Sequence, residues 1–254
     1  MCGRYAVGGD IEELNREFDA ISTGADGWVE NWNIRPTDPV PIVLESTKTG
    51  ETVRRLELAR WSLLPSWSKE PRMKVPTFNA RSEDVMTKAS YKASVVSKRA
   101  LIPADGYYEW HTEGKVKTPY FIHPPQGRVA FAGLYSWWRN PALADDDPAR
   151  WVLSTTILTM DAVPSLADLH PRNPVVLPED FWDDWLSPEI DGDQSFVDLA
   201  VEAAAPVATA LQVRRVAPLR NDATDASLAS PVSEPASQPV EPTQRVEPVE
   251  TPGA

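Results

Sequence analysis

Three segments of the chain carry apolar residues at helical spacing. One segment begins after Asp10, and the other two cover residues 179–186 and 195–205. Asp10 is suited to cap a helix N-terminus, and Leu14 and Phe18 follow it on one face. Pro178 fits the first turn of the second segment, where its missing N–H costs nothing. The pattern therefore predicts three helices.

Six segments are rich in β-branched and aromatic residues and are bounded by Pro, Gly or Asp, which is typical of strands. They cover residues 40–44, 53–60, 120–123, 128–136, 151–159 and 211–216. These strands do not alternate regularly with helices, so a doubly wound parallel sheet is not favoured. We predict an α+β fold, with a mainly antiparallel sheet or a partly closed barrel flanked by helices.

The last part of the chain has a different composition. Residues 221–254 contain six prolines and no aromatic residue. Such a segment cannot bury enough apolar surface to offset the entropy of ordering it. We therefore predict a single domain over residues 1–220 and a disordered, proline- and glutamate-rich acidic tail over residues 221–254.

The composition of the remainder is that of a globular protein without disulfides. The chain is 42% hydrophobic and contains ten tryptophans but a single cysteine, which excludes an internal disulfide framework. The N-terminus has no basic segment followed by an apolar one, and no run of ~20 apolar residues occurs. We expect a cytoplasmic protein that does not span a membrane.

The charge is unevenly distributed. A formal net charge of -12 argues against a nucleic-acid partner. However, residues 69–99 contain eight basic and only three acidic side chains, whereas residues 221–254 contain six acidic and one basic. The overall charge therefore hides a basic middle stretch that is compatible with an anionic partner.

Several common chemistries lack their sequence signatures. The three histidines are not at metal-ligand spacing, and no cysteine pair is available. Neither a P-loop nor a Gly-x-Gly-x-x-Gly motif occurs. We therefore expect no metal and no cofactor.

The only cysteine is the second residue of the chain. Removal of Met1 would leave an α-amine, with a reference pKa of about 7.7–8.0, beside a thiol of pKa ~8.5. An aldehyde can condense with this amine to an imine, which the thiolate can close to a thiazolidine ring. The alternative is that Cys2 is a small buried apolar residue, as free cysteines often are.

Four polar groupings stand out as candidate sites. They are CGRY (residues 2–5), TFNARSE (77–83), PADGYYEW (103–110) and HPRNPV (170–175). Each has an ordinary structural explanation: Asn79 could cap a turn, Glu109 could be a surface strand residue, and His170 could be a satisfied loop histidine. Taken singly, none of them decides the function.

Together these groupings resemble the SRAP family (SOS response-associated peptidase), whose members crosslink to abasic sites in single-stranded DNA. The similarity runs from Cys2 to about Val216. The segments that carry it are CGRY (2–5), NWNIRPT (31–37), RWSLLPSW (60–67), NARSE (79–83), PADGYYEW (103–110), AGLY (132–135) and HPR (170–172).

The resemblance implies a catalytic set of four residues. Cys2, exposed by self-removal of Met1 or by an aminopeptidase, would attack the ring-opened abasic sugar. Asn79 would position the Cys2 amine and the sugar. Glu109 would move protons during ring opening and Met1 release, and His170 would act as acid and base near the imine.

The resemblance also implies a path for single-stranded DNA that contains an abasic site. Arg81 and Arg172 would hold the phosphates on either side of the reacting sugar, and Arg4 is a further candidate. Trp67 and Trp110 could support stacked or splayed bases. Core packing is the alternative role for these tryptophans.

Two residues depart from the family pattern. Ser62 replaces a usual glycine, and Asn173 replaces a usual methionine close to His170.

Two other function classes remain possible interpretations of the sequence. The alternatives are a plain N-terminal-nucleophile peptidase and a non-catalytic module that binds single-stranded DNA. Paired arginines argue against the first, because a peptidase needs no phosphate contacts. An N-terminal aminothiol argues against the second, because binding alone does not require one.

Overall fold

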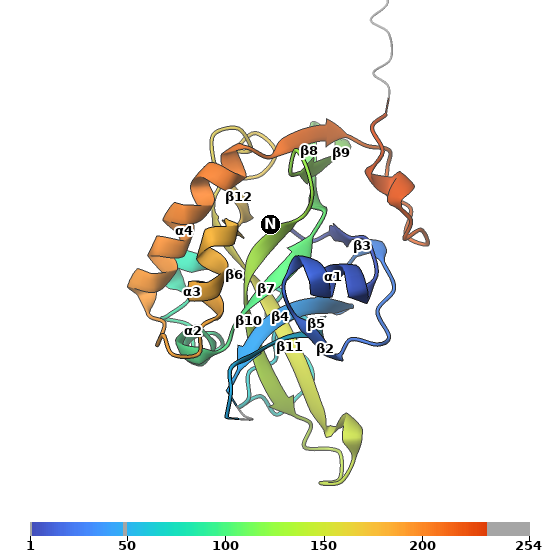
Figure 1. Cartoon of the computed structure of the whole chain (residues 1–254). Coiled ribbons are helices and arrows are strands. Elements are labelled where there is room, and N and C mark those ends of the chain that lie inside the picture. Colours follow the sequence, from blue (N-terminus) through green and yellow to red (C-terminus); the bar gives the residue numbers. More distant parts are fainter. Residues whose placement is uncertain (1, 48–49, 233–254) are drawn as a thin grey trace, which may run out of the picture.

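The computed structural model describes residues 2–47 and 50–232. Five strands form a closed barrel: β4 (Pro39–Ser46), β5 (Val53–Trp61), β7 (Arg99–Ala104), β10 (Val129–Arg139) and β11 (Trp151–Asp161) (Figure 1). They pair antiparallel in the order β11-β10-β7-β4-β5. A parallel pairing of β5 with β11, with Arg60 opposite Ser154, closes the ring. The predicted α+β fold with a mainly antiparallel sheet or a barrel is confirmed, and the barrel is closed rather than partly closed.

Short strands extend the barrel sheet at its edges. They are β2 (Ile21–Gly24) beside β5, β6 (Asn79–Arg81) and β12 (Arg172–Pro174) beside β11, and β13 (Val176–Leu177) beside β10. A second sheet has the order β14-β9-β8-β1-β3. Its strands are β14 (Gln212–Arg215), β9 (Val116–His123), β8 (Gly106–Glu113), β1 (Tyr5–Val7) and β3 (Asn31–Ile34). All six predicted strands are present, with shifted ends.

The helices lie on two sides of the barrel. They are α1 (Ile11–Glu17), α2 (Lys92–Ser97), α3 (Trp182–Leu186) and α4 (Gln194–Thr209), with 3-10 turns η1 (Ser82–Asp84), η2 (Pro148–Arg150), η3 (Glu179–Phe181) and η4 (Ala226–Ala229). Helices α2, α3 and α4 gather on one side, and α1 lies on the other (Figure 1). Asp10 caps α1 as predicted, since its carboxylate accepts a 2.8 Å hydrogen bond from the Glu13 N–H. The predicted helix over 179–186 begins with the turn η3 and continues as α3.

The barrel interior forms most of a continuous apolar core. Trp61, Trp138 and Trp185 are fully buried in the protein, so these tryptophans have a packing role. Arg99, which the sequence places in the basic stretch, is also buried. Its guanidinium donates hydrogen bonds to five backbone carbonyls, including those of Val95 and Trp185. Arg99 therefore ties α2 to α3 and adds no positive charge to the outer surface.

The packed part of the chain continues beyond the boundary predicted at residue 220. The side-chain amide of Asn33 donates a 2.7 Å hydrogen bond to the carbonyl of Ala223. Leu228 and Ala229 in η4 are buried, and Val216 bridges to Pro231. Residues 221–232 therefore belong to the folded domain. The disorder predicted for residues 233–254 concerns a segment outside the described residues.

Candidate active site around Cys2

Strand β11 carries two short strands at one end, and these place two of the candidate residues. Thr159 of β11 lies opposite Arg81 of β6 on one side and opposite Pro174 of β12 on the other. Asn79 begins β6, and His170 precedes β12 by two residues. Segments almost a hundred residues apart in sequence are thus brought to the same end of one strand.

The second sheet brings Cys2 and Glu109 to each other. Strand β1 runs antiparallel to β8 with Tyr5 opposite Tyr107, so the residues just before β1 lie beside Glu109. The Tyr108 N–H donates a 2.9 Å hydrogen bond to the Arg4 carbonyl, which extends this pairing toward Cys2. Glu109 is close enough for its negative charge to raise the pKa of the Cys2 thiol.

Asn79 connects the two sheets at Cys2. Its side-chain Nδ2 donates a 2.7 Å hydrogen bond to the backbone carbonyl of Cys2. The Tyr91 hydroxyl donates a 3.3 Å hydrogen bond to the backbone carbonyl of Asn79 itself. The Asn79 Oδ1 atom is buried and has no hydrogen-bond partner in the described part of the chain. This oxygen can therefore accept a hydrogen bond from a group that the protein itself does not supply.

The Cys2 thiol lies in an apolar enclosure. The residue is 0% exposed, and among the described residues its Sγ makes one long 3.7 Å contact, to the Arg4 carbonyl. Burial, followed by the charge of Glu109, raises the pKa of the thiol. The thiol is therefore neutral at physiological pH and must give up its proton in order to act as a nucleophile.

Glu109 and His170 have environments suited to proton transfer. Burial raises the pKa of the Glu109 carboxyl above its ordinary value, so this group holds a proton more readily than an exposed glutamate. Burial lowers the pKa of His170. The Nδ1 atom of His170 lies 3.0 Å from the Arg172 N–H and 3.1 Å from the Arg172 carbonyl oxygen, so the main chain of Arg172 orients the ring. Glu109 therefore holds its proton more readily, and His170 less readily, than the same groups in water.

The three arginines predicted to hold DNA differ in their present contacts. Arg81 is exposed at the end of β6. Arg4 donates a 2.5 Å hydrogen bond to the Asn33 side-chain oxygen. Arg172 is buried, with its guanidinium paired to the carboxylates of Glu83 and Asp161 at 2.5 and 2.7 Å. A phosphate at Arg172 would have to compete with these two carboxylates, whereas Arg81 has its side chain in solvent.

The basic stretch lines a hollow next to Asn79. A cavity of about 510 Å³ is bordered by Arg60, Arg72, Lys74 and Phe78, the residue before Asn79. Trp67 is 57% exposed and borders a smaller adjoining cavity that also contains Arg72 and Lys74. Trp110 is half-buried and packs against a small apolar cluster at the second sheet. Of the two predicted base-stacking residues, Trp67 therefore presents more of its ring to solvent.

Tyr5 and Tyr107 are part of the site although the sequence assigned them no role. Both are buried, and the hydroxyl of each has no hydrogen-bond partner in the described part of the chain. Burial, followed by the negative charge that Cys2 carries when ionised, raises the pKa of both hydroxyls. Tyr5 belongs to the segment CGRY and Tyr107 to PADGYYEW. Both are strand residues whose side chains pack in the apolar core.

The two departures from the family pattern have local structural roles. The Ser62 hydroxyl shares a 3.0 Å hydrogen bond with the Thr77 hydroxyl. Asn173 is buried; its Oδ1 accepts a hydrogen bond from the Val163 N–H at 3.0 Å, and its Nδ2 donates to the Pro174 carbonyl at 2.7 Å. Asn173 thus fixes the loop between β11 and β12 from the inside.

Among residues 2–47 and 50–232, no group of three or more His, Cys, Asp and Glu side chains could hold a metal ion. In the same residues, no helix is long and apolar enough to cross a membrane.

The model of one protein family, described as SOS response associated peptidase (SRAP), matches residues 1–222. The chain belongs to the SRAP family. The match covers both sheets and the segments that carry Cys2, Asn79, Glu109 and His170. It ends within the segment 221–232 that the structure shows to be packed on the domain.

Relatives in bacteria and eukaryotes resemble this SRAP chain. Abasic site processing protein YoqW of Bacillus subtilis is 30% identical over 192 residues, which cover 74% of this chain and 81% of YoqW. Abasic site processing protein YMR114C of Saccharomyces cerevisiae is 30% identical over 218 residues, which cover 73% of this chain and 55% of the yeast protein. The relatives therefore share most of the SRAP domain.

Two crystal structures share the SRAP fold. A protein from Bacteroides thetaiotaomicron superposes with a TM-score of 0.74 at 20% identity, over 91% of this chain and all of that one. A protein from Bordetella bronchiseptica gives a TM-score of 0.67 at 24% identity, over 85% of this chain and all of that one. At these identities the superpositions show the fold alone.

Proposed function

We propose that this protein captures abasic sites in single-stranded DNA by forming a covalent thiazolidine with Cys2 after removal of Met1. The observation that carries the proposal is the 2.7 Å hydrogen bond from Asn79 to the Cys2 carbonyl, in a site that also contains Glu109. The name of the relatives, abasic site processing proteins, supports the same substrate class.

The first step is hydrolysis of the bond between Met1 and Cys2, which consumes one water and frees the Cys2 α-amine. Glu109 is the group placed to move the proton of that water, because burial raises its pKa toward the range of a general acid–base catalyst. Asn79 holds the Cys2 carbonyl and so fixes the position of the Cys2 nitrogen, the leaving group of this step. An external aminopeptidase would give the same product.

The second step joins the amine to the sugar. Protonation by Glu109 opens the closed sugar to its aldehyde, and the α-amine adds to C1′ and releases one water as the imine forms. Asn79 keeps the amine in place, and its unpartnered Oδ1 accepts a hydrogen bond from the substrate or the amine. The neutral imidazole of His170 takes up and returns the protons of this condensation.

The third step closes the ring. The Cys2 thiol adds across the imine, so that sulfur bonds to C1′ and the thiol proton passes to nitrogen. Oxidation states do not change, and no cofactor is consumed. A persistent imine would acidify the neighbouring C–H and promote strand scission by β-elimination. Ring closure removes the C=N bond, so the strand stays intact and the site is shielded.

The DNA strand is proposed to approach along the basic hollow of Arg60, Arg72 and Lys74 beside Asn79. Arg81 would contact a phosphate next to the reacting sugar, and Arg4 and Arg172 are further candidates. Trp67 offers an exposed ring on which a neighbouring base can stack, and Trp110 is the second such candidate.

The test is a denaturing gel. The purified chain is incubated with a single-stranded oligonucleotide carrying one abasic site, boiled in detergent and examined for a band of protein joined to DNA. Cys2→Ala should abolish the band, and Cys2→Ser should give at most a heat-labile product. Intact mass should show that the crosslinked species lacks Met1. A crosslinked protein that retains Met1 would overturn the mechanism, and a peptidase or a simple binding module would give no band.

A further inference from the structure

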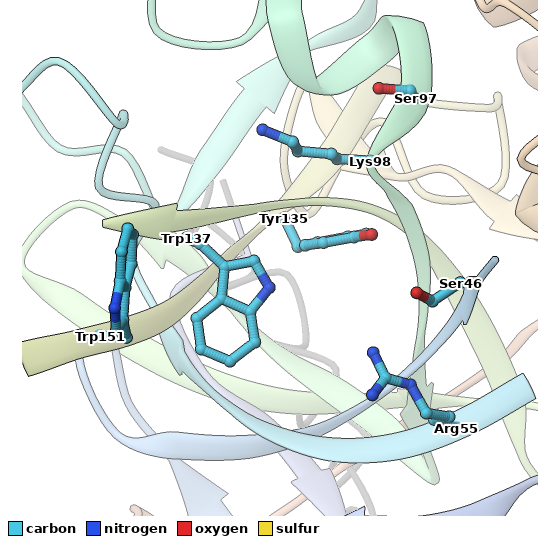
Figure 2. Close-up of a pocket in the computed structure, with 7 residues that line it drawn as sticks. All are labelled: Ser46, Arg55, Ser97, Lys98, Tyr135, Trp137 and Trp151. Atoms are coloured by element: carbon cyan, nitrogen blue, oxygen red, sulfur yellow. The ribbon is translucent and has the colours of Figure 1, made fainter. Parts of the chain in front are cut away.

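A third cavity opens far from Cys2. It has a volume of about 560 Å³ and is lined by Ser46, Arg55, Ser97, Lys98, Tyr135, Trp137 and Trp151 (Figure 2). Along β11, Trp151 precedes Ile157, the partner of Asn79, by six residues. At ~3.3 Å per strand residue this is a separation of roughly 20 Å. The Cys2 site therefore does not account for this cavity.

Two tryptophans supply its aromatic surface. Trp137 of β10 lies opposite Leu153, and Trp151 lies two residues earlier on β11, so the two indoles occupy diagonal positions on one face of the ladder. The described residues include no ring contact between them, and Trp151 is 55% exposed. Figure 2 shows both rings among the residues that line the cavity. Each indole therefore offers the cavity an aromatic surface against which a planar group can pack.

The polar lining selects for negative charge. Lys98 and Arg55 reach the cavity on opposite sides of Tyr135 and Trp137 (Figure 2). No carboxylate belongs to the lining residues. Outside the lining, the carboxylate of Glu57 forms a 3.2 Å ion pair with Arg55, whereas no lining residue carries a negative charge that could compensate Lys98. In a protein with a net charge of -12, such a lining is unusual and attracts an anion.

We propose that this cavity binds a nucleotide unit, meaning a planar base attached to a phosphate. The base would stack on Trp137 or Trp151, and the phosphate would lie between Arg55 and Lys98 and accept hydrogen bonds from the nearby hydroxyls. The volume lies within the range of small-ligand pockets, about 300–1,000 Å³. The ligand is either a free mononucleotide or one unit of a DNA strand, since both present the same chemistry.

Binding is measured on the full chain carrying Cys2→Ala, so that covalent capture does not contribute. Isothermal titration compares 2′-deoxyadenosine 5′-monophosphate with deoxyadenosine, with inorganic phosphate and with a twelve-residue oligothymidylate that has no abasic site. We expect the mononucleotide to bind more tightly than either fragment. Trp151→Ala and Lys98→Ala should each weaken binding about tenfold, and Trp151→Phe should restore most of the loss because it keeps an aromatic face.

The control is Lys115→Ala, which removes an exposed lysine outside the cavity, at the turn between β8 and β9. It should leave mononucleotide affinity unchanged. If only the oligonucleotide responds to Trp151→Ala and Lys98→Ala, the natural ligand is a unit of a strand; if only the mononucleotide responds, it is a free nucleotide. If neither responds, the proposal is overturned. None of the probes can crosslink, so these outcomes are independent of the function proposed for Cys2.

Discussion

The side-chain amide of Asn79 donates its hydrogen bond to the backbone carbonyl of Cys2, and not to the thiol. The bond fixes the residue's backbone, from which both reacting groups project. It also leaves the thiol free to rotate toward an imine once the amine has reacted. Strand β6, three residues long, thus positions Cys2 through a contact with its main chain.

Asn79→Ala should slow crosslinking about 10- to 100-fold, because the Cys2 backbone loses the contact that holds it for attack. Affinity for undamaged single-stranded DNA should change little, since Asn79 carries no charge. Single-turnover crosslinking rates and DNA titrations measure the two effects. Tyr91→Phe is the matched control, because it removes only the weaker 3.3 Å bond to the Asn79 main chain and should leave the rate nearly unchanged.

Glu109→Gln should reduce the crosslinking rate by ~10²–10⁴-fold, the usual contribution of one acid–base group. It should also change stability in a pH-dependent way. Burial raises the pKa of Glu109 in the folded protein above its value of ~4.3 in the unfolded chain. Below pH ~4.3 the carboxyl is protonated in both states, and its burial costs no stability. As the pH rises from there through the folded-state pKa, the unfolded chain ionises first and the folded protein loses stability.

The Glu109→Gln variant does not lose this stability at higher pH, because glutamine carries no charge. Melting temperatures of the two proteins should therefore agree near pH 4, and the variant should be the more stable one near pH 7 to 8. A constant difference across this range would mean that Glu109 ionises as an ordinary carboxyl in the folded protein.

Tyr107 and Tyr108 are adjacent, and they allow a buried hydroxyl without a hydrogen-bond partner to be compared with one that has a partner. Tyr107→Phe removes a hydroxyl with no partner in the described residues and should leave stability unchanged or increased, because an unsatisfied buried group costs ~1–3 kcal/mol. Tyr108→Phe removes the 2.9 Å hydrogen bond to the Trp32 carbonyl and should destabilise by about 1 kcal/mol. Urea unfolding compares them. If Tyr107→Phe slows crosslinking without loss of stability, its hydroxyl contacts the reacting groups.

Two truncations test where the domain ends. Deletion of residues 233–254 should leave both melting temperature and crosslinking unchanged. Deletion of residues 221–254 also removes the Asn33–Ala223 and Trp32–Thr224 hydrogen bonds and the buried Leu228, so it should lower the melting temperature by several degrees. Equal stability of the two truncated proteins would show that residues 221–232 do not contribute to folding.

The sequence predicted those helices and strands that depend on the spacing of neighbouring residues. The Asp10 cap, the long strand β11 and the apolar stripe of α3 all follow from spacing within a few residues. The closure of the barrel does not, because the pairing of Arg60 with Ser154 joins strands that are distant in the chain. Strand β6 has only three residues and no periodicity.

The sequence pointed to the residues of the candidate site but not to the electrostatics around them. Sequence motifs pointed to Cys2 and Asn79, and the structure brings them together. The sequence counted Arg99 and Arg172 as positive charges available to a partner. Both are buried, and each is already held by backbone carbonyls or carboxylates, which only the three-dimensional packing of distant segments could reveal.

The difference between Arg81 and Arg172 leads to a prediction about salt dependence. A small basic hollow in an acidic protein should neutralise few phosphates, about two to four, so log K against log salt should have a shallow slope of about -1.5 to -3. Arg81→Ala should flatten this slope by roughly 0.7 and weaken binding for every sequence alike, because phosphate contacts carry no base information. Arg172→Ala should instead lower the melting temperature, since it leaves Glu83 and Asp161 without their cation. Fluorescence anisotropy at several salt concentrations, paired with thermal unfolding, separates the two arginines. If Arg172→Ala flattens the slope while keeping the native melting temperature, its guanidinium exchanges carboxylates for phosphate when DNA binds.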